Sequence, residues 1–207
     1  MAGAVLAAFA AVPPVEWVAA GLALAYLLLA IRQNSWCWAC AIASAVLYLS
    51  LFARAGLQMQ AALQVFYIAM AVYGWRAWRG TAAARPLAIS RWPAQRHALA
   101  IAAVVAVATV NGWLVARAAP PALLPYVDAL IAWGSVLATW MVARKLIENW
   151  WYWIVLDLAA ALLFARQGLV VTALLFLVYT GLAFRGLLQW RMDERAATVS
   201  GQAGTHA

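Results

Sequence analysis

The segment HALAIAAVVAVATVNGWLVA, residues 97–116, contains no Lys, Arg, Asp or Glu. A helix needs about 20 consecutive apolar residues to cross the hydrocarbon of a bilayer, so this segment predicts a membrane-spanning helix. The rest of the chain is similar in character. Of its 207 residues, 69% are hydrophobic and 10% are charged, against about 45–50% and about 25% in soluble domains. The sequence therefore predicts an all-α membrane protein.

Three apolar segments precede this one and three follow it. They lie at 15–31, 35–53, 57–75, 125–143, 149–165 and 169–184. We therefore expect seven transmembrane helices. The one long connection, at 79–96, is basic and contains two prolines. The two ends of the chain differ. Residues 1–14 are expected to lie at the membrane surface as a short interfacial segment, and 191–207 to be a disordered polar tail.

The basic residues decide the expected orientation. With the N-terminus outside, the cytoplasmic connections hold eleven of the fourteen Lys and Arg residues and the outer connections hold three, Arg54, Arg117 and Arg166. Lys and Arg are enriched in cytoplasmic loops, so the sequence predicts an N-out, C-in topology. The net charge of +8 is explained by this asymmetry, and no nucleic-acid partner is expected.

A shift of 112 residues superposes two halves of the chain without a gap from Trp38 onward. The matched residues include rare types: Trp38 with Trp150, Phe52 with Phe164, Arg54 with Arg166, Gly56 with Gly168, Tyr67 with Tyr179, Gly74 with Gly186, and Trp78 with Trp190. The halves are 15–78 and 125–190. Three helices bring the chain to the opposite side of the membrane from where it started. A second three-helix unit in the same orientation therefore needs one more crossing, which the helix at 97–117 supplies. The sequence predicts a 3+1+3 arrangement of parallel repeats, in which transporters bind substrate between the halves.

Polar residues inside the predicted helices are candidates for substrate contact. At 149–165, Asn149, Trp153 and Asp157 recur every four residues with Trp150 beside them, which places them on one helical stripe. Asp128 lies in the outer half of 125–143. A carboxylate in hydrocarbon costs about 2.5–3.5 kcal/mol, so these acids are expected to face the interior.

A second stripe lies on 57–75 and includes Gln64 and Tyr67. The two stripes together offer aromatic faces and amides that suit a planar, cationic ring. The alternative is structural: tryptophans form interfacial belts, and Gln or Asn can join helices by hydrogen bonds.

No cofactor, metal site or enzymatic activity is predicted. His97 and His206 are separate from each other, so no histidine pair for a metal or haem is evident. Cys37 and Cys40 form a C-x-x-C pattern inside an apolar segment, which favours small packing residues over redox chemistry. A membrane thiol oxidoreductase is a remote alternative. A retinal photoreceptor is excluded because Lys145, the one lysine, lies in a connection rather than in a late helix.

Two motifs resemble the nicotinamide riboside transporter family (PnuC-type vitamin transporters). The segment Ala61 to Trp78 looks like its LQ-x-F…YGW-x-x-W segment, and Arg144 to Trp153, RKLIENWWYW, is similar to its RK-x-x-ENW-x-x-W segment. The stretch 164–168, FARQG, is similar to the one that leads into the family's last helix. The resemblance covers about residues 15–190.

The resemblance implies facilitated diffusion of nicotinamide riboside across the bacterial inner membrane, as part of vitamin uptake for NAD biosynthesis. It implies trapping by a separate cytoplasmic kinase and assembly as a homotrimer in the lipid membrane. It also implies that Gln64, Trp153 and Asp157 occupy substrate positions. Some relatives carry Asn at position 157, and similar transporters take thiamine, riboflavin or deoxynucleosides, so these substrates remain alternatives.

Overall fold

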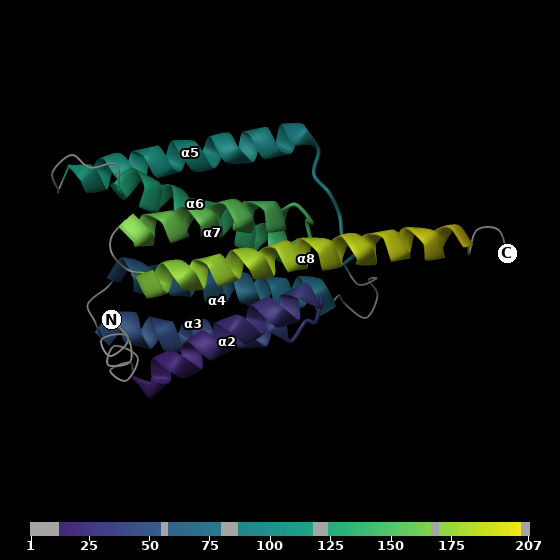
Figure 1. Ribbon diagram of the computed structural model, residues 1–207, viewed down its shortest axis with the longest axis horizontal. Coiled ribbons are helices and arrows are strands. Elements are labelled where there is room, and N and C mark those ends of the chain that lie inside the picture. Colours follow the sequence, from purple (N-terminus) through teal and green to yellow (C-terminus); the bar gives the residue numbers. More distant parts are fainter. Residues whose placement is uncertain (1–12, 55–57, 80–86, 118–123, 167–169, 204–207) are drawn as a thin grey trace. The chain divides into compact units, whose positions relative to one another are not determined.

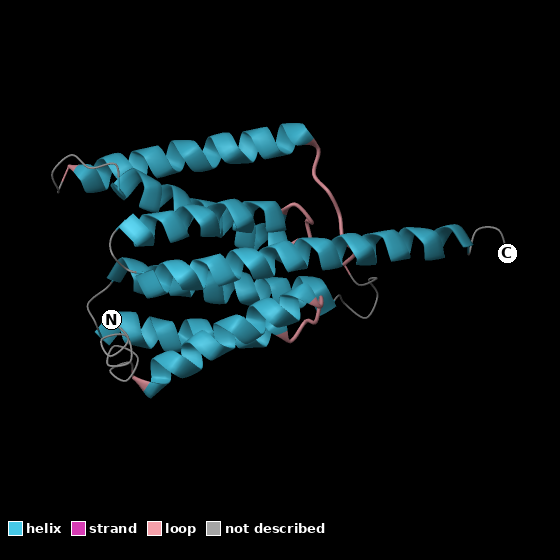
Figure 2. Cartoon of the chain, viewed as in Figure 1, coloured by secondary structure: helices cyan, strands magenta, loops and turns pink. Residues whose placement is uncertain are grey.

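The computed structural model describes residues 13–54, 58–79, 87–117, 124–166 and 170–203. In this part of the chain every regular element is a helix (Figures 1 and 2). The helices are α2 (Pro14–Ile31), α3 (Cys37–Arg54), α4 (Gln58–Arg79), α5 (Ala94–Ala116), α6 (Leu124–Ala143), α7 (Asn149–Arg166) and α8 (Val170–Ala203). They correspond one for one to the seven helices expected from the sequence, and the all-α fold is confirmed.

The chain divides into two compact units, residues 1–86 and 87–207. In the first unit α3 packs against both α2 and α4. In the second unit α5 packs on α6, α6 on α7, and α7 on α8. The extra helix α5 therefore belongs to the second unit by its contacts.

The helices of the two repeats begin and end at corresponding positions. α2 ends at Ile31 and α6 ends at Ala143, and α3 and α7 each have 18 residues, from Cys37 and Asn149. α4 and α8 begin at Gln58 and Val170. Each pair is separated by the same 112 residues as the matched side chains. The 3+1+3 arrangement is therefore present in the backbone, with α5 as the helix that has no counterpart.

The turn after the first helix of each repeat is also the same. Gln33 and Lys145 have positive φ values of 53° and 50°. The amide of the next residue donates to a carbonyl five residues earlier, Asn34 to Leu29 and Leu146 to Met141, each at 2.9 Å. This pattern is a Schellman cap, which ends a helix by using its free carbonyls. It turns the chain directly into α3 or α7.

A pair of tryptophans joins the second and third helices of each repeat. Trp38 and Trp78 meet edge to face at 5.4 Å and 84°, and Trp150 and Trp190 meet at 5.4 Å and 90°. All four rings are buried. Edge-to-face packing is a favoured geometry of aromatic pairs. The matched tryptophans thus hold the same position in both units.

Five of the described helices, α2, α3, α5, α6 and α8, are long and apolar enough to span a membrane by composition alone. The sequences of α4 and α7 are more polar: α4 contains three glutamines, and α7 contains Asn149 and Asp157. Their partners in the repeat, α8 and α3, do meet the criterion. The two helices that carry the predicted binding stripes, α4 and α7, are therefore the two described helices that fall outside this criterion.

The end of α8 corrects one expectation. The tail from 191 was expected to be disordered, but the helix continues to Ala203 (Figure 1). Two side-chain contacts accompany the added turns. Gln189 Nε2 donates to Asp193 Oδ1 at 2.9 Å, and Arg91 forms a two-pronged ion pair with Glu194 at 2.8 and 2.5 Å. A hydrogen bond between side chains one turn apart and an ion pair between elements both stabilise a helix that apolar packing does not reach.

The basic connection is shorter than expected, because α5 begins at Ala94 rather than at 97. Its described part, 87–93, is held by backbone bonds to the turn before α7. Ser90 N donates to Lys145 O at 3.0 Å, and Ile147 N donates to Ser90 O at 3.1 Å. The connection is therefore fastened to the second unit. The expected interfacial segment 1–14 falls almost entirely outside the described residues.

Candidate functional site

The stripe predicted on α7 faces the interior of its unit. Asn149 is fully buried, Asp157 is 6% exposed, and Trp153 between them is half-buried. The stripe continues into the buried Ala160 and Ala161. The helix thus turns its polar side inward and its apolar residues, such as Val155, outward. This is the orientation that a polar stripe takes in a membrane helix, where lipid is on the outer side.

Asp157 is the most informative member of this stripe. Within the described part of the chain no hydrogen bond or ion pair to its carboxylate is found. Its counterpart in the first repeat is the buried Ala45, so the fold itself does not require an acid at this position. A buried polar group without a partner is costly. The arrangement therefore leaves an acceptor available for a ligand.

Asn149 and Trp150 are packed more tightly. Asn149 Nδ2 donates to the Leu146 carbonyl at 2.6 Å, which ties the first turn of α7 to the preceding turn, while its Oδ1 is buried without a partner among the described residues. Trp150 is 1% exposed and packs on Trp190. These described contacts are structural ones. A substrate contact for either residue stays a prediction.

Gln64 and Tyr67 lie on α4, in the first unit, and both are half-buried. Tyr67 packs edge to face against Phe66 at 5.8 Å. In the repeat Gln64 corresponds to Phe176, whereas Tyr67 corresponds to Tyr179. The amide is therefore particular to the first unit, as the acid Asp157 is particular to the second.

Asp128 lies near the start of α6 and is exposed. It was expected to face the interior. In its own unit it does not, because its neighbour Ala129 takes the buried position. The structure thus brings four of the predicted residues together on α7, places two on α4 and leaves Asp128 apart from both groups.

The two cysteines lie in the first turn of α3 without a disulfide between them, and Cys37 is completely buried. Cys37 is the repeat counterpart of Asn149. A buried thiol in apolar surroundings is unreactive. This environment agrees with the expected packing role.

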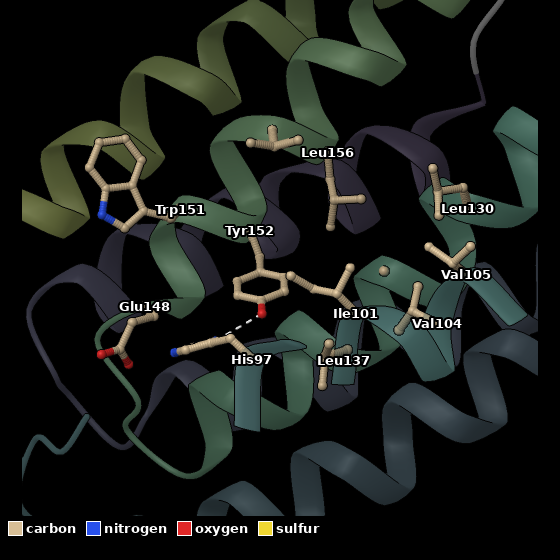
Figure 3. Close-up of a pocket in the computed structure, with 12 residues that line it drawn as sticks. His97, Ile101, Val104, Val105, Leu130, Leu137, Glu148, Trp151, Tyr152 and Leu156 are labelled. Carbon is tan, nitrogen blue, oxygen red and sulfur yellow. Dashed lines mark hydrogen bonds between the residues drawn. The ribbon is translucent and has the colours of Figure 1, made fainter. Parts of the chain in front are cut away.

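One cluster escaped the sequence analysis. His97 Nδ1 lies 2.9 Å from the Tyr152 hydroxyl, and the His97 ring meets Trp92 edge to face at 5.5 Å. His97, Tyr152 and Glu148 line a cavity of about 460 Å³ between α5, α6 and α7 (Figure 3). His97 and Tyr152 are 55 residues apart on different helices. No spacing rule could have joined them.

The comparisons with known proteins agree with this picture. The sequence pattern of the nicotinamide mononucleotide transporter family matches residues 13–192. The chain belongs to this family. The resemblance to PnuC-type transporters is therefore confirmed, and the chain is a multi-pass transporter of the bacterial inner membrane.

Two curated relatives in this family differ in their cargo. The chain is 30% identical to the riboflavin/roseoflavin transporter RibM of Streptomyces davaonensis, over 84% of this chain and 83% of that protein. It is 26% identical to the nicotinamide riboside transporter PnuC of Escherichia coli, over 64% of this chain and 66% of that protein. Vitamin transport is common to both.

A solved structure has the same fold. The crystal structure of the vitamin B3 transporter PnuC superposes with a TM-score of 0.68, covering 93% of this chain and 87% of the other. The two sequences are 18% identical. At that identity the likeness concerns the fold alone. The family assignment thus defines a vitamin transporter but not its substrate.

Proposed function

We propose that this protein carries nicotinamide riboside across the inner membrane by facilitated diffusion. The observation that supports this substrate most directly is the buried carboxylate of Asp157 on α7, which has no hydrogen-bond or ion-pair partner among the described residues. Nicotinamide riboside contains a cationic pyridinium ring. An acid in a low-dielectric interior attracts such a cation far more strongly than it would in water.

Trp153 adds an aromatic surface to the same stripe. It lies one helical turn from Asp157 and is half-buried, so part of its ring is accessible. An indole face attracts a cationic ring by roughly 0.5–2 kcal/mol. Gln64 of the first unit supplies an amide that fits the carboxamide of the pyridine ring, since both groups donate and accept hydrogen bonds.

Riboflavin is the second candidate, favoured by the 30% identity to a riboflavin transporter. Its ring system is larger and uncharged. The aromatic surface of Trp153 would pack against the riboflavin ring equally well. The buried carboxylate, however, would not attract riboflavin by charge, because riboflavin is uncharged. Asp157 is therefore the residue that distinguishes the two proposals.

The proposed transport is passive. Asp157 is the one acid near the middle of a membrane-spanning segment predicted from the sequence, so no chain of acids and bases of the kind that couples transport to protons is evident in these segments. Net uptake would then require a separate cytoplasmic kinase that phosphorylates the vitamin and retains it. We propose assembly as a homotrimer, each protomer with its own pathway.

Competition uptake tests the substrate. Purified protein in proteoliposomes should take up labelled nicotinamide riboside, and excess unlabelled nicotinamide riboside should abolish the signal while riboflavin, thiamine and deoxynucleosides leave it. Strong competition by riboflavin alone would replace the first candidate with the second. Imposing a proton or sodium gradient tests the mechanism: accumulation above the external concentration would contradict passive transport.

A further inference from the structure

The cavity at His97 is an open groove whose floor is α6. α5 and α7 each pack on α6, and within the described residues their backbones do not pack on each other. Gly134 allows the close approach of α6 and α7, since a Cβ there would lie 2.6 Å from Leu156. The groove between α5 and α7 is lined mainly by aliphatic side chains (Figure 3).

The apolar part of the groove is open to the membrane. Ile101 on one wall is 49% exposed and Val155 on the other is 64% exposed. On α5 the lining runs from His97 to Val105, about 12 Å at 1.5 Å per residue. One leaflet contributes about 15 Å, half of a hydrocarbon core of about 30 Å. The groove therefore has nearly the length of one leaflet.

The polar groups lie at one end of the groove. In Figure 3 His97, Tyr152 and Glu148 stand together, with the aliphatic residues on the other side of His97 and Tyr152. Glu148 Oε2 and His97 Nε2 are buried and have no hydrogen-bond partner among the described residues. Buried polar atoms are nearly always paired. Two orphaned atoms at the head of an apolar groove point to a ligand with a polar head and an apolar tail.

The sequence places this end at the cytoplasmic surface. Arg96 precedes His97 in the chain, and Arg144 lies four residues before Glu148; both are exposed. Basic residues mark the cytoplasmic side and attract lipid phosphates. The head of the groove thus combines an acid whose Oε2 has no hydrogen-bond partner among the described residues with nearby cations, which matches a zwitterionic head group.

We propose that this groove binds a phosphatidylethanolamine-type lipid of the cytoplasmic leaflet, with one acyl chain between α5 and α7 and the head-group ammonium at Glu148. A primary ammonium carries N–H donors for the Glu148 carboxylate, in a charge-assisted hydrogen bond. The quaternary ammonium of phosphatidylcholine has none. His97 Nε2 lies beside the same position and bonds to the remaining polar atoms of the head group.

The wild-type protein provides the first test. Purified, delipidated protein is titrated with lipids of identical acyl chains whose head group is ethanolamine, N-methylethanolamine, N,N-dimethylethanolamine or choline, and bound lipid is measured by native mass spectrometry. The three head groups that keep an N–H should bind, and affinity should fall by about tenfold at choline, where the one charge-assisted hydrogen bond is lost. Equal binding of all four would mean annular lipid only and would overturn the proposal.

Matched variants provide the second test. Val104→Trp fills the groove and should abolish tight binding, whereas Leu99→Trp, on the opposite face of α5 and 73% exposed, should not. Glu148→Gln should remove the preference for ethanolamine over choline, whereas Glu16→Gln, an exposed acid of α2, should keep it. A Val104→Trp protein that still binds ethanolamine lipid like the wild type would show that the lipid lies elsewhere.

Discussion

Gly186 lies directly against the indole of Trp150: a Cβ at this glycine would come within 2.6 Å of the ring. Gly74 stands in the same relationship to Trp38 in the first unit, where a Cβ would also overlap the ring. Real Cβ atoms do not approach other atoms so closely. The two glycines are therefore required by close packing of the third helix of each repeat on the second.

Replacement of either glycine by alanine should destabilise the protein. For Gly186→Ala we expect a loss of about 1–3 kcal/mol, the usual cost of overpacking a rigid core, because the large Trp150 ring cannot move aside easily. Thermal unfolding in detergent measures the effect. Gly181→Ala is the matched control on the same helix, since nothing lies within 4 Å of its Cβ; it should be neutral or slightly stabilising. Equal losses in both variants would contradict the packing role.

Trp153 and Gln64 should contribute to substrate binding. Trp153→Ala should weaken nicotinamide riboside binding strongly, while Trp153→Phe should retain part of the affinity because an aromatic face remains. Gln64→Ala should cost about 0.5–1.5 kcal/mol, a typical hydrogen bond. Calorimetric titration of the purified variants measures both, with the exposed neighbour Trp151→Ala as control. If both Trp153→Ala and Gln64→Ala bind nicotinamide riboside with wild-type affinity, these two side chains have a packing role and do not contact the substrate.

Asp157→Asn should separate the two candidate substrates. The substitution keeps the shape and the hydrogen-bonding capacity but removes the charge, so binding of the nicotinamide riboside cation should fall by about tenfold or more. Binding of uncharged riboflavin should change little. The same calorimetric titration with both vitamins gives the answer. Equal effects on both would mean that the carboxylate does not recognise the positive charge.

The topology can be checked independently of transport. The distribution of Lys and Arg predicts an outer N-terminus and a cytoplasmic C-terminus. A reporter active only in the periplasm should be silent when fused after residue 207, and a cytoplasmic reporter should be active there. The reverse pattern would overturn the assignment and move the head of the lipid groove to the outer leaflet.

The ion pair between Arg91 and Glu194 should contribute modestly to stability, and the contribution should require opposite charges at the two positions. Its side chains are 52% and 24% exposed, so we expect about 0.2–1 kcal/mol. Arg91→Glu and Glu194→Arg should each lower the thermal midpoint at low salt, and the double exchange should restore it. High salt should reduce all three differences. A double variant as unstable as the single ones would show that the contact contributes nothing.

The sequence predicted the repeat because its markers are rare residues. Trp38, Gly74 and their counterparts recur since packing at those positions admits few alternatives. The polar stripe on α7 was likewise visible, because an acid such as Asp157 stands out in an apolar helix. Gln64 and the stripe on α7 belong to different units. That Gln64 faces this stripe therefore stays a prediction.

Other features had no sequence signal. The contact of His97 with Tyr152 joins distant helices through side chains whose direction no periodicity encodes. The extension of α8 was missed because its residues are polar. Its helix is supported by local contacts such as that of Gln189 with Asp193, which hydropathy does not register.

In each repeat the second and third helices are joined by a tryptophan pair, Trp38–Trp78 or Trp150–Trp190, and by the glycine beside it. This has a consequence for biosynthesis. A membrane protein is inserted from its N-terminus onward, and compact units fold as they emerge. The contacts described for α2, α3 and α4 lie within the first unit. The first half of the chain can therefore fold while the second half is still being synthesised on the ribosome.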